Sequence, residues 1–198
     1  MTYRVAVAVS GRGSNLAALG DALAGQGDAA IVAVLSDRDA PALELAARRN
    51  WQPHRLVDPT SVAEWLTVLE QRGVDLLVLA GYLKLVPAGV VAAMAGRIIN
   101  IHPALLPLYG GPGMYGGRVH AAVLAAGDAE SGASVHLVDE EYDRGDVLGQ
   151  GRVPVEPGDT PDRLAQRVLA MEHRLLPAAV LAAAHAGRPV PFTLQDAE

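Results

Sequence analysis

The sequence predicts an α/β fold with a doubly wound, mostly parallel sheet, antiparallel C-terminal strands and a long C-terminal helix. Short apolar runs alternate with segments whose apolar residues recur every three or four positions, as repeated β-α units do. Towards the C-terminus two strand-like runs are joined by an acidic turn instead of a helix, which predicts an antiparallel pair. A long helical pattern follows that pair.

The first part of the chain contains three predicted strands and two predicted helices. Tyr3–Val9 is apolar and β-branched and ends before a glycine-rich turn, so it is expected to be a buried strand. Ser14–Gly25 has apolar residues at helical spacing and ends at glycine, which predicts a helix. Ala30–Leu35 is an apolar second strand, and Pro41–Arg49 is a helix with proline in its first turn. Pro53–Leu56 is a short third strand.

The middle of the chain continues the alternation and then breaks it. Thr60–Arg72 is a predicted helix that a glycine ends, and Val74–Leu79 is a fourth strand. Pro87–Ala95 is a short helix, and Arg97–His102 is a fifth strand. Residues 103–117 are rich in glycine and proline and are predicted to form a loop.

The last part supplies the antiparallel strands and the long helix. Arg118–Ala126 is a helix closed by a glycine, Gly132–Val138 and Val147–Val155 are strands, and Pro161–Ala186 is the final helix. Open α/β sheets bind ligands at the carboxyl ends of their strands, where the strand order reverses. We therefore expect the functional side chains at that edge of the sheet.

Composition and charge exclude several classes of protein. The chain has 198 residues, of which 51% are hydrophobic, and this suits a single domain over residues 1–198. It has no Cys, which excludes a disulfide scaffold, an iron–sulfur cluster and a Cys nucleophile. The net charge of −6 argues against a nucleic-acid partner.

The sequence also gives no reason to expect a membrane span or a metal site. Charged residues break the longest apolar run, and the N-terminus leads straight into a strand, so we expect a cytoplasmic protein without a membrane partner. Scattered histidines, His120, His136 and His173, give no reason to expect a metal site.

The glycine-rich turn after the first strand is the first candidate segment. It consists of Ser10, Gly11, Arg12, Gly13, Ser14 and Asn15. Glycines let a ligand approach the backbone, and the N–H groups of the following helix attract an anion. Ser14 or Asn15 is expected to cap that helix or to bind the same anion. The turn is not a Walker loop, and Leu16 replaces the third glycine of a dinucleotide fingerprint. We interpret it as a phosphate site, with a plain capped turn as the alternative.

The end of the fifth strand is the second candidate segment. Residues two apart in a strand share a face, so Asn100 and His102 project together while Ile101 faces the other layer. An amide donor beside an imidazole suits stabilisation of an oxyanion with proton transfer. The turn between Asp139 and Asp146 is acidic, and most of its carboxylates are expected to be solvated. One of them is expected to reach His102, raise its pKa and fix its orientation, but the pattern does not select which.

These segments, in this order, resemble the family of phosphoribosylglycinamide formyltransferases from Val5 to about Pro177. The most specific stretches are Asn100–Pro107, Gly132–Val138, Tyr142–Gly145 and Gln150–Val155. The resemblance implies a Rossmann-like formyltransferase fold. It also implies transfer of the formyl group of 10-formyltetrahydrofolate, a co-substrate, to the amine of glycinamide ribonucleotide in purine biosynthesis. No metal cofactor is implied, the partners are these small molecules, and a homodimer is left open.

The resemblance also implies roles for particular residues. Asn100 and His102 stabilise the oxyanion, and Asp143 is the carboxylate that orients and charges His102. Glycinamide ribonucleotide is contacted by Gly11, Arg12, Gly13, Ser14, Asn15, Gly81, Pro103 and Glu172. The folate is contacted by Tyr82, Leu83, Lys84, Leu85, Val86, Asn100, Asp139, Glu140, Glu141 and Asp143.

The chain departs from the family pattern in places, and other functions are weighed against it. The loop Leu108–Val119 is longer than in many members, and Lys84 stands where Arg is common. The glycine-rich loop is expected to act as a lid.

Three other functions are possible for the same sequence. One alternative is another formyl transfer, or hydrolysis of the formyl donor. A second is a nucleotide-binding module without chemistry. A third is a dinucleotide oxidoreductase, which Asp37 at the end of the second strand favours and Leu16 opposes.

Overall fold

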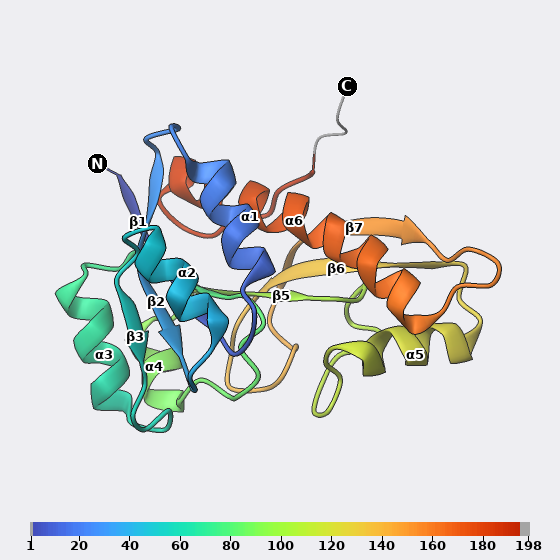
Figure 1. Cartoon of the computed structure of the whole chain (residues 1–198), viewed down its shortest axis with the longest axis horizontal. Helices are drawn as coiled ribbons and strands as arrows, with labels where there is room; N and C mark the ends of the chain where they lie inside the picture. Colours follow the sequence, from blue (N-terminus) through green and yellow to red (C-terminus); the bar gives the residue numbers. More distant parts are fainter. Residues whose placement is uncertain (1, 195–198) are drawn as a thin grey trace.

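A computed structural model describes residues 2–194 and shows one seven-stranded sheet (Figure 1). The strand order is β3-β2-β1-β4-β5-β6-β7. The first five strands in the chain run parallel, and β6 and β7 are antiparallel to their neighbours. The fold class predicted from the sequence is therefore confirmed, including the antiparallel end of the sheet.

The predicted strands and helices are all present, with ends that shift by one or two residues. The strands are β1 (Tyr3–Val9), β2 (Ala29–Ser36), β3 (Pro53–Arg55), β4 (Leu76–Leu79), β5 (Ile98–His102), β6 (Glu130–Leu137) and β7 (Val147–Pro154). The helices are α1 (Ser14–Leu23), α2 (Pro41–Arg48), α3 (Val62–Gln71), α4 (Ala88–Ala93), α5 (Gly117–Ala126) and α6 (Pro161–Ala186).

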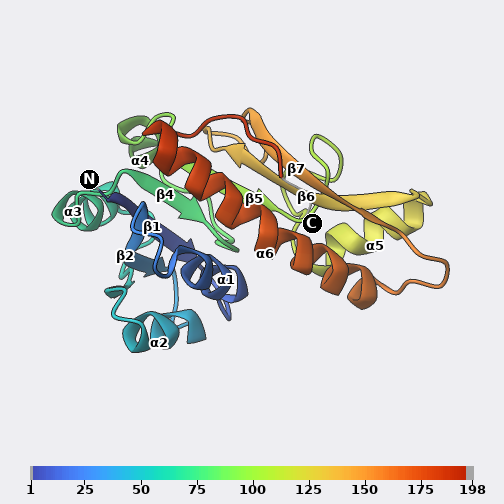
Figure 2. The same ribbon diagram turned by 90° about the horizontal axis from the view of Figure 1, so that it is seen from above.

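Helices cover both faces of the sheet. Alternate residues of β1 point to opposite faces, so Val5 and Val7 pack in the apolar cluster that includes α1, α2 and α6. Ala6 and Ala8 pack in the cluster that includes α3 and α4, around the fully buried Trp65. Figure 2 shows α6 running diagonally across its face of the sheet. None of the helices within residues 2–194 has the length and apolar character needed to cross a bilayer.

The strand order reverses at β1, which has β2 on one side and β4 on the other. Two hydrogen bonds tie the ends of β1 and β4 together. The N–H of Ser10 donates to the carbonyl of Gly81 at 3.0 Å, and the N–H of Leu83 donates to Oγ of Ser10 at 3.0 Å. Strand β5 lies beside β4 and ends at His102. The loops after these three strands therefore meet at the switch point of the sheet.

Candidate active site

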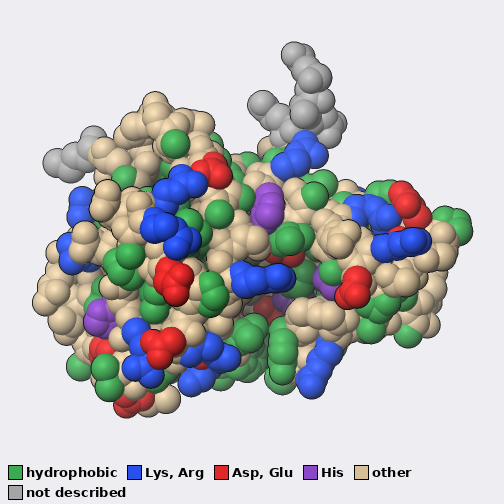
Figure 3. All heavy atoms as spheres, in the orientation of Figure 1, with side chains coloured by type: hydrophobic (Ala, Val, Ile, Leu, Met, Phe, Trp, Pro, Cys, Tyr) green, Lys and Arg blue, Asp and Glu red, His purple; other side chains and the backbone are tan. Residues whose placement is uncertain are grey.

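A cavity of 540 Å³ opens at the carboxyl ends of β4 and β5, a volume suited to small-molecule ligands. Figure 3 shows the face of Figure 1 hollowed near its middle, with acidic and histidine side chains set back from the surface. The predicted site residues that line the cavity are Asn15, Gly81, Tyr82, Leu83, Lys84, Leu85, Val86, Asn100, His102, Pro103, Asp139, Glu141, Asp143 and Glu172. Those that do not line it are Gly11, Arg12, Gly13, Ser14 and Glu140.

The imidazole of His102 is buried and has an oxygen acceptor near each ring nitrogen. Its Nε2 lies 2.8 Å from the backbone carbonyl of Tyr109, and its Nδ1 lies 3.5 Å from Oδ1 of Asp143. A carbonyl oxygen only accepts hydrogen bonds, so Nε2 carries a hydrogen. In the neutral ring, Nδ1 then has a free lone pair that faces the carboxylate.

Burial lowers the pKa of His102, and the charge of Asp143 opposes this shift without overcoming it. The expectation that a carboxylate of the acidic turn raises the pKa of His102 holds for the contribution of Asp143, but burial makes the net shift a lowering. The reason is desolvation: only 4% of His102 is exposed, and removal from water disfavours the charged ring. Burial therefore favours the neutral ring, and in that form the hydrogen bond to the Tyr109 carbonyl places the hydrogen on Nε2 and the lone pair on Nδ1.

Asp143 is the carboxylate of the acidic turn that reaches His102. Its Oδ2 accepts a hydrogen bond from the N–H of Gly111 at 2.9 Å, and its Oδ1 lies 3.4 Å from Nδ2 of Asn100. Burial opposes ionisation of this carboxyl, but contacts with His136, His102 and Gly111 outweigh it and hold the pKa of Asp143 below its usual range. The other acidic residues of the turn, Asp139, Glu140, Glu141 and Asp146, are exposed, as expected for a solvated turn.

His136 joins the site, although sequence analysis assigned it no role. It lies directly opposite Asn100 in the antiparallel register of β5 and β6. Its Nδ1 donates to the carbonyl of Leu137 at 2.7 Å, which leaves Nε2 to accept from Nδ2 of Asn100 at 3.0 Å. An Asn100–His136 contact can be found from sequence only after the pairing register of the two strands is assigned.

His120 of α5 also lines the cavity. Burial, together with the nearby His102, lowers the pKa of His120. The three histidines that look scattered in the sequence therefore differ in position. His120 and His136 line the cavity, and His173 does not. Within residues 2–194, no three His, Asp or Glu side chains are arranged to hold a metal ion.

Asn15 of α1 and Glu172 of α6 meet at the other end of the cavity. Nδ2 of Asn15 donates to Oε2 of Glu172 at 2.6 Å, and each residue is 8% exposed. Burial raises the pKa of Glu172, and the hydrogen bond from Asn15 partly opposes this shift. Two residues that are far apart in the chain thus place a buried polar pair in the cavity wall.

The expectation that Ser14 or Asn15 caps α1 is wrong. Gly13 occupies the N-cap position with φ 80°, and no side chain caps the helix. A Cβ at Gly13 would lie 2.8 Å from the Cβ of Ala42, so the close approach of α2 requires glycine there. The first N–H groups of α1 remain without a side-chain cap and are available to an anion.

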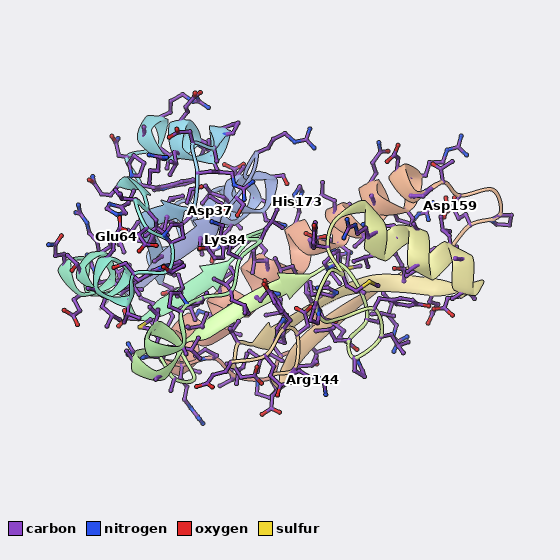
Figure 4. The ribbon with its side chains drawn as sticks, turned by 90° about the horizontal axis from the view of Figure 1, so that it is seen from below. Asp37, Glu64, Lys84, Arg144, Asp159 and His173 are labelled. Atoms are coloured by element: carbon purple, nitrogen blue, oxygen red, sulfur yellow. The ribbon has the colours of Figure 1, made fainter. Side chains whose placement is uncertain are left out.

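The segment from Tyr82 to Val86 forms an apolar wall of the cavity. The ring of Tyr82 packs edge-to-face on Trp65 with 5.5 Å between ring centroids, which anchors the segment to the core. Leu83 and Leu85 are about half exposed. Lys84 lies with its Nζ 3.9 Å from Oδ2 of Asp37, and Figure 4 shows these two residues close together. The glycine-rich loop from Gly111 to Gly117 forms a facing wall.

Comparison with known proteins identifies relatives across most of the chain. The model of the formyl transferase family matches residues 3–180. The phosphoribosylglycinamide formyltransferase of Arabidopsis thaliana, a chloroplast protein, is 44% identical over 183 residues, covering 87% of this chain and 62% of the relative. The phosphoribosylglycinamide formyltransferase of Mycobacterium tuberculosis is 40% identical over 190 residues, covering 93% and 86% of the two chains.

A solved structure agrees with these sequence relatives. The phosphoribosylglycinamide formyltransferase from Anaplasma phagocytophilum has a TM-score of 0.87 at 34% identity, over 94% of this chain and 88% of that chain. The chain spans about three-fifths of the length of the plant relatives that it matches.

Proposed function

Because the chain belongs to the formyl transferase family, we propose that it transfers the formyl group of 10-formyltetrahydrofolate to the amine of N1-(5-phospho-D-ribosyl)glycinamide. The products are the formylglycinamide ribonucleotide and tetrahydrofolate, in the synthesis of purines. The observation that carries this proposal is the contact of Asp143 with both Asn100 and His102 in the cavity wall. The names of the relatives support the same reaction.

The two ends of the cavity suit the two substrates. The apolar wall at Tyr82–Val86 suits a flat heteroaromatic ring, and the exposed Lys84 at its rim suits the carboxylates of a folate tail. At the other end, the Asn15–Glu172 pair suits ribose hydroxyls. The uncapped N–H groups at the start of α1, next to Asn15, suit a phosphate that extends beyond the residues lining the cavity. Asn100, His102 and Asp143 line the cavity between these ends.

The proposed reaction needs no nucleophile from the protein, because the substrate amine attacks the formyl carbon. A C–N bond forms, and the formyl oxygen becomes an oxyanion. Asn100 is suited to stabilise this oxyanion, because one of its amide hydrogens has only the long 3.4 Å contact with Asp143.

Proton transfer is assigned to His102. Its Nδ1 takes the proton of the attacking amine and returns it to the departing folate nitrogen as the original C–N bond breaks. Asp143, 3.5 Å from Nδ1, stabilises the imidazolium that forms in between. A carboxylate that stays ionised, as the lowered pKa of Asp143 provides, is required for this role.

Replacement of His102 tests the proposed function. His102→Ala is expected to lower kcat by about 10²–10⁴-fold, which is the usual contribution of general acid–base catalysis. Calorimetry is expected to show unchanged binding of glycinamide ribonucleotide. His185→Ala removes an exposed imidazole at the far end of α6 and serves as the control, with wild-type turnover expected. Near-normal turnover of His102→Ala would contradict the assignment.

The structure favours this function over a dinucleotide oxidoreductase. That alternative requires an acid at the end of β2 that is free to bind ribose hydroxyls. Asp37 occupies this place, but its side chain is only 1% exposed and is paired with Nη2 of Arg38 at 2.7 Å. Its hydrogen-bonding capacity is therefore already used inside the protein.

A further inference from the structure

We infer that Tyr109 and Asp128 form a clamp that holds the His102 ring in a single tautomer, with the hydrogen on Nε2. In this inference, which rests on the proposed function, Tyr109 is a positioning residue that acts through His102. Its backbone carbonyl accepts from Nε2 of His102 at 2.8 Å. At the other end of the same residue, the hydroxyl donates to Oδ2 of Asp128 at 2.5 Å. The clamp therefore runs from Asp128 through Tyr109 to His102.

The backbone of Tyr109 adopts a conformation that its side chain disfavours. Its φ is 55°, in the left-handed region where a residue with a Cβ is strained. Such conformations persist where the surrounding contacts over-determine them, and they are typical of functional sites. Asp143, with φ 56°, is a second case, and it contacts the other ring nitrogen of His102. Both strained residues therefore hold the same imidazole.

The clamp lies outside the cavity at its Asp128 end. Asp128 follows α5 and precedes β6, and it is not among the residues that line the cavity. The ring of Tyr109 packs against the main apolar cluster, which fixes the direction of its hydroxyl. The hydrogen bond with Asp128 raises the pKa of Tyr109, so the hydroxyl remains a donor. Asp128 thus anchors Tyr109 without contacting any group that faces the substrates.

The tautomer matters because it decides which nitrogen moves the proton. With Nε2 bound to a carbonyl, Nδ1 is the basic nitrogen. The charged or titratable groups around His102 are Asp143 on the acidic turn, His136 on β6 and His120 on α5. Gly111, two residues after Tyr109, donates to Asp143, so one short segment orients both partners of the proton transfer. The clamp therefore sets the geometry in which Nδ1 faces Asp143.

Tyr109→Phe is the direct test, because it removes the hydroxyl and keeps the ring. We expect kcat to fall by about tenfold, well short of the ~10⁴-fold loss that a wrong tautomer causes in a serine protease triad. The KM values of both substrates are expected to change by less than about twofold. Nitrogen-15 NMR of the His102 ring is expected to show one tautomer in the wild-type protein and a mixture in the variant.

Changes at Asp128 test the second half of the clamp. Asp128→Asn keeps an acceptor oxygen and is expected to retain most of the turnover, whereas Asp128→Ala is expected to match Tyr109→Phe. The double variant of Tyr109→Phe and Asp128→Ala is expected to be no slower than either single variant, because both remove one hydrogen bond. Tyr3→Phe, which removes the hydroxyl of a buried tyrosine on β1, is the matched control and is expected to behave as the wild type.

Two results would overturn the clamp. One is a Tyr109→Phe variant with wild-type kcat and an unchanged tautomer signal. The other is a loss of stability in which kcat and KM change together while the tautomer is kept, which indicates a structural role alone. If the wild-type protein transfers no formyl group, the proposed function fails, but the NMR experiment still decides whether the clamp exists.

Discussion

At the scale of single residues, burial and the charge of Asp143 have opposite effects on the pKa of His102. Burial favours the neutral ring, while Asp143 favours the charged ring. The neutral form prevails before the reaction, and the carboxylate is in place to stabilise the charged form when it appears. A general base must be unprotonated before it accepts the proton, and burial of His102 favours that form.

The pH dependence of the reaction follows from these pKa shifts. The acid limb of kcat/KM is expected below pH 6.5, the ordinary pKa of histidine, because burial lowers the pKa of His102. Asp143→Asn removes the charge that raises this pKa, so the limb is expected to move to still lower pH, at reduced kcat. Rates measured between about pH 4.5 and 8 test this expectation. A limb that moves upward in Asp143→Asn would mean that another group controls it.

The residue-level predictions from sequence succeeded where a local rule sufficed. The two-residue period of a strand places Asn100 and His102 on one face, and in the structure Ile101 packs in the apolar cluster on the other face, with α1 and α6, although it also lines the cavity. The contact of His136 with Asn100 was missed because its position opposite Asn100 depends on the register of two strands. The lowering of the His102 pKa by burial was not predictable from the sequence, since burial is a property of the folded chain.

At the scale of elements, α1 and α6 join in the Asn15–Glu172 pair. The periodicity of the sequence predicted both helices, and α6 has the predicted bounds, Pro161–Ala186. Their contact through two buried polar side chains was not predictable from periodicity. The uncapped start of α1 was also missed, because the requirement for Gly13 comes from the packing of α2.

Glu172→Gln separates the binding role of this pair from its cost in stability. The pKa of Glu172 is raised above 4.5, so its contribution to stability is present below pH 4.5 and is lost as the pH rises through the raised pKa. At pH 7.5, Gln removes a buried charge and keeps the acceptor for Asn15. The melting temperature is expected to rise by about 2–4 °C, the effect of ~1 kcal/mol in a chain of this size.

The same substitution is expected to weaken binding. The KM for glycinamide ribonucleotide is expected to increase about tenfold, as the loss of one charged hydrogen bond to a hydroxyl predicts, with an unchanged KM for the folate. Calorimetric melting and steady-state kinetics measure the two effects. Glu70→Gln, on the exposed surface of α3, is the control and is expected to change neither. A lower melting temperature for Glu172→Gln would contradict the account of the buried carboxylate.

At the scale of the whole molecule, the sheet brings together loops that follow three strands distant in sequence. The order β2-β1-β4-β5 places the ends of β1, β4 and β5 side by side, and the cavity opens there. The alternation of strands and helices was sufficient to predict this edge of the sheet as the site. The shape of the cavity, with its facing glycine-rich loop, depends on packing that no local pattern specifies.

The molecule is expected to lose stability as the pH falls below 6.5. Burial lowers the pKa values of His102, His120 and His173 in the folded state, so their contribution is complete above pH 6.5 and is lost at lower pH. Asp159, whose pKa the hydrogen bond from Arg167 lowers below 3.8, adds a further loss in more acidic solution. Urea midpoints at pH 7.5, 6.0 and 5.0 measure the effect.

A matched variant identifies the histidines as the source of that acid sensitivity. A protein carrying His120→Asn and His173→Asn is expected to lose less stability between pH 7.5 and 5.0 than the wild type, because one buried and one half-buried imidazole with lowered pKa values are absent. A wild-type protein whose urea midpoint stays constant or rises over this range would contradict the expectation.

The most direct test of the account is a spectrophotometric assay of the purified protein with glycinamide ribonucleotide and 10-formyldideazafolate. Release of the deformylated folate analogue is expected to depend on the amine and to be nearly abolished by Asp143→Asn. Release that proceeds equally well without the amine would contradict it and indicate hydrolysis of the formyl donor. The absence of release with both substrates present would contradict it as well and direct the search to a different formyl acceptor.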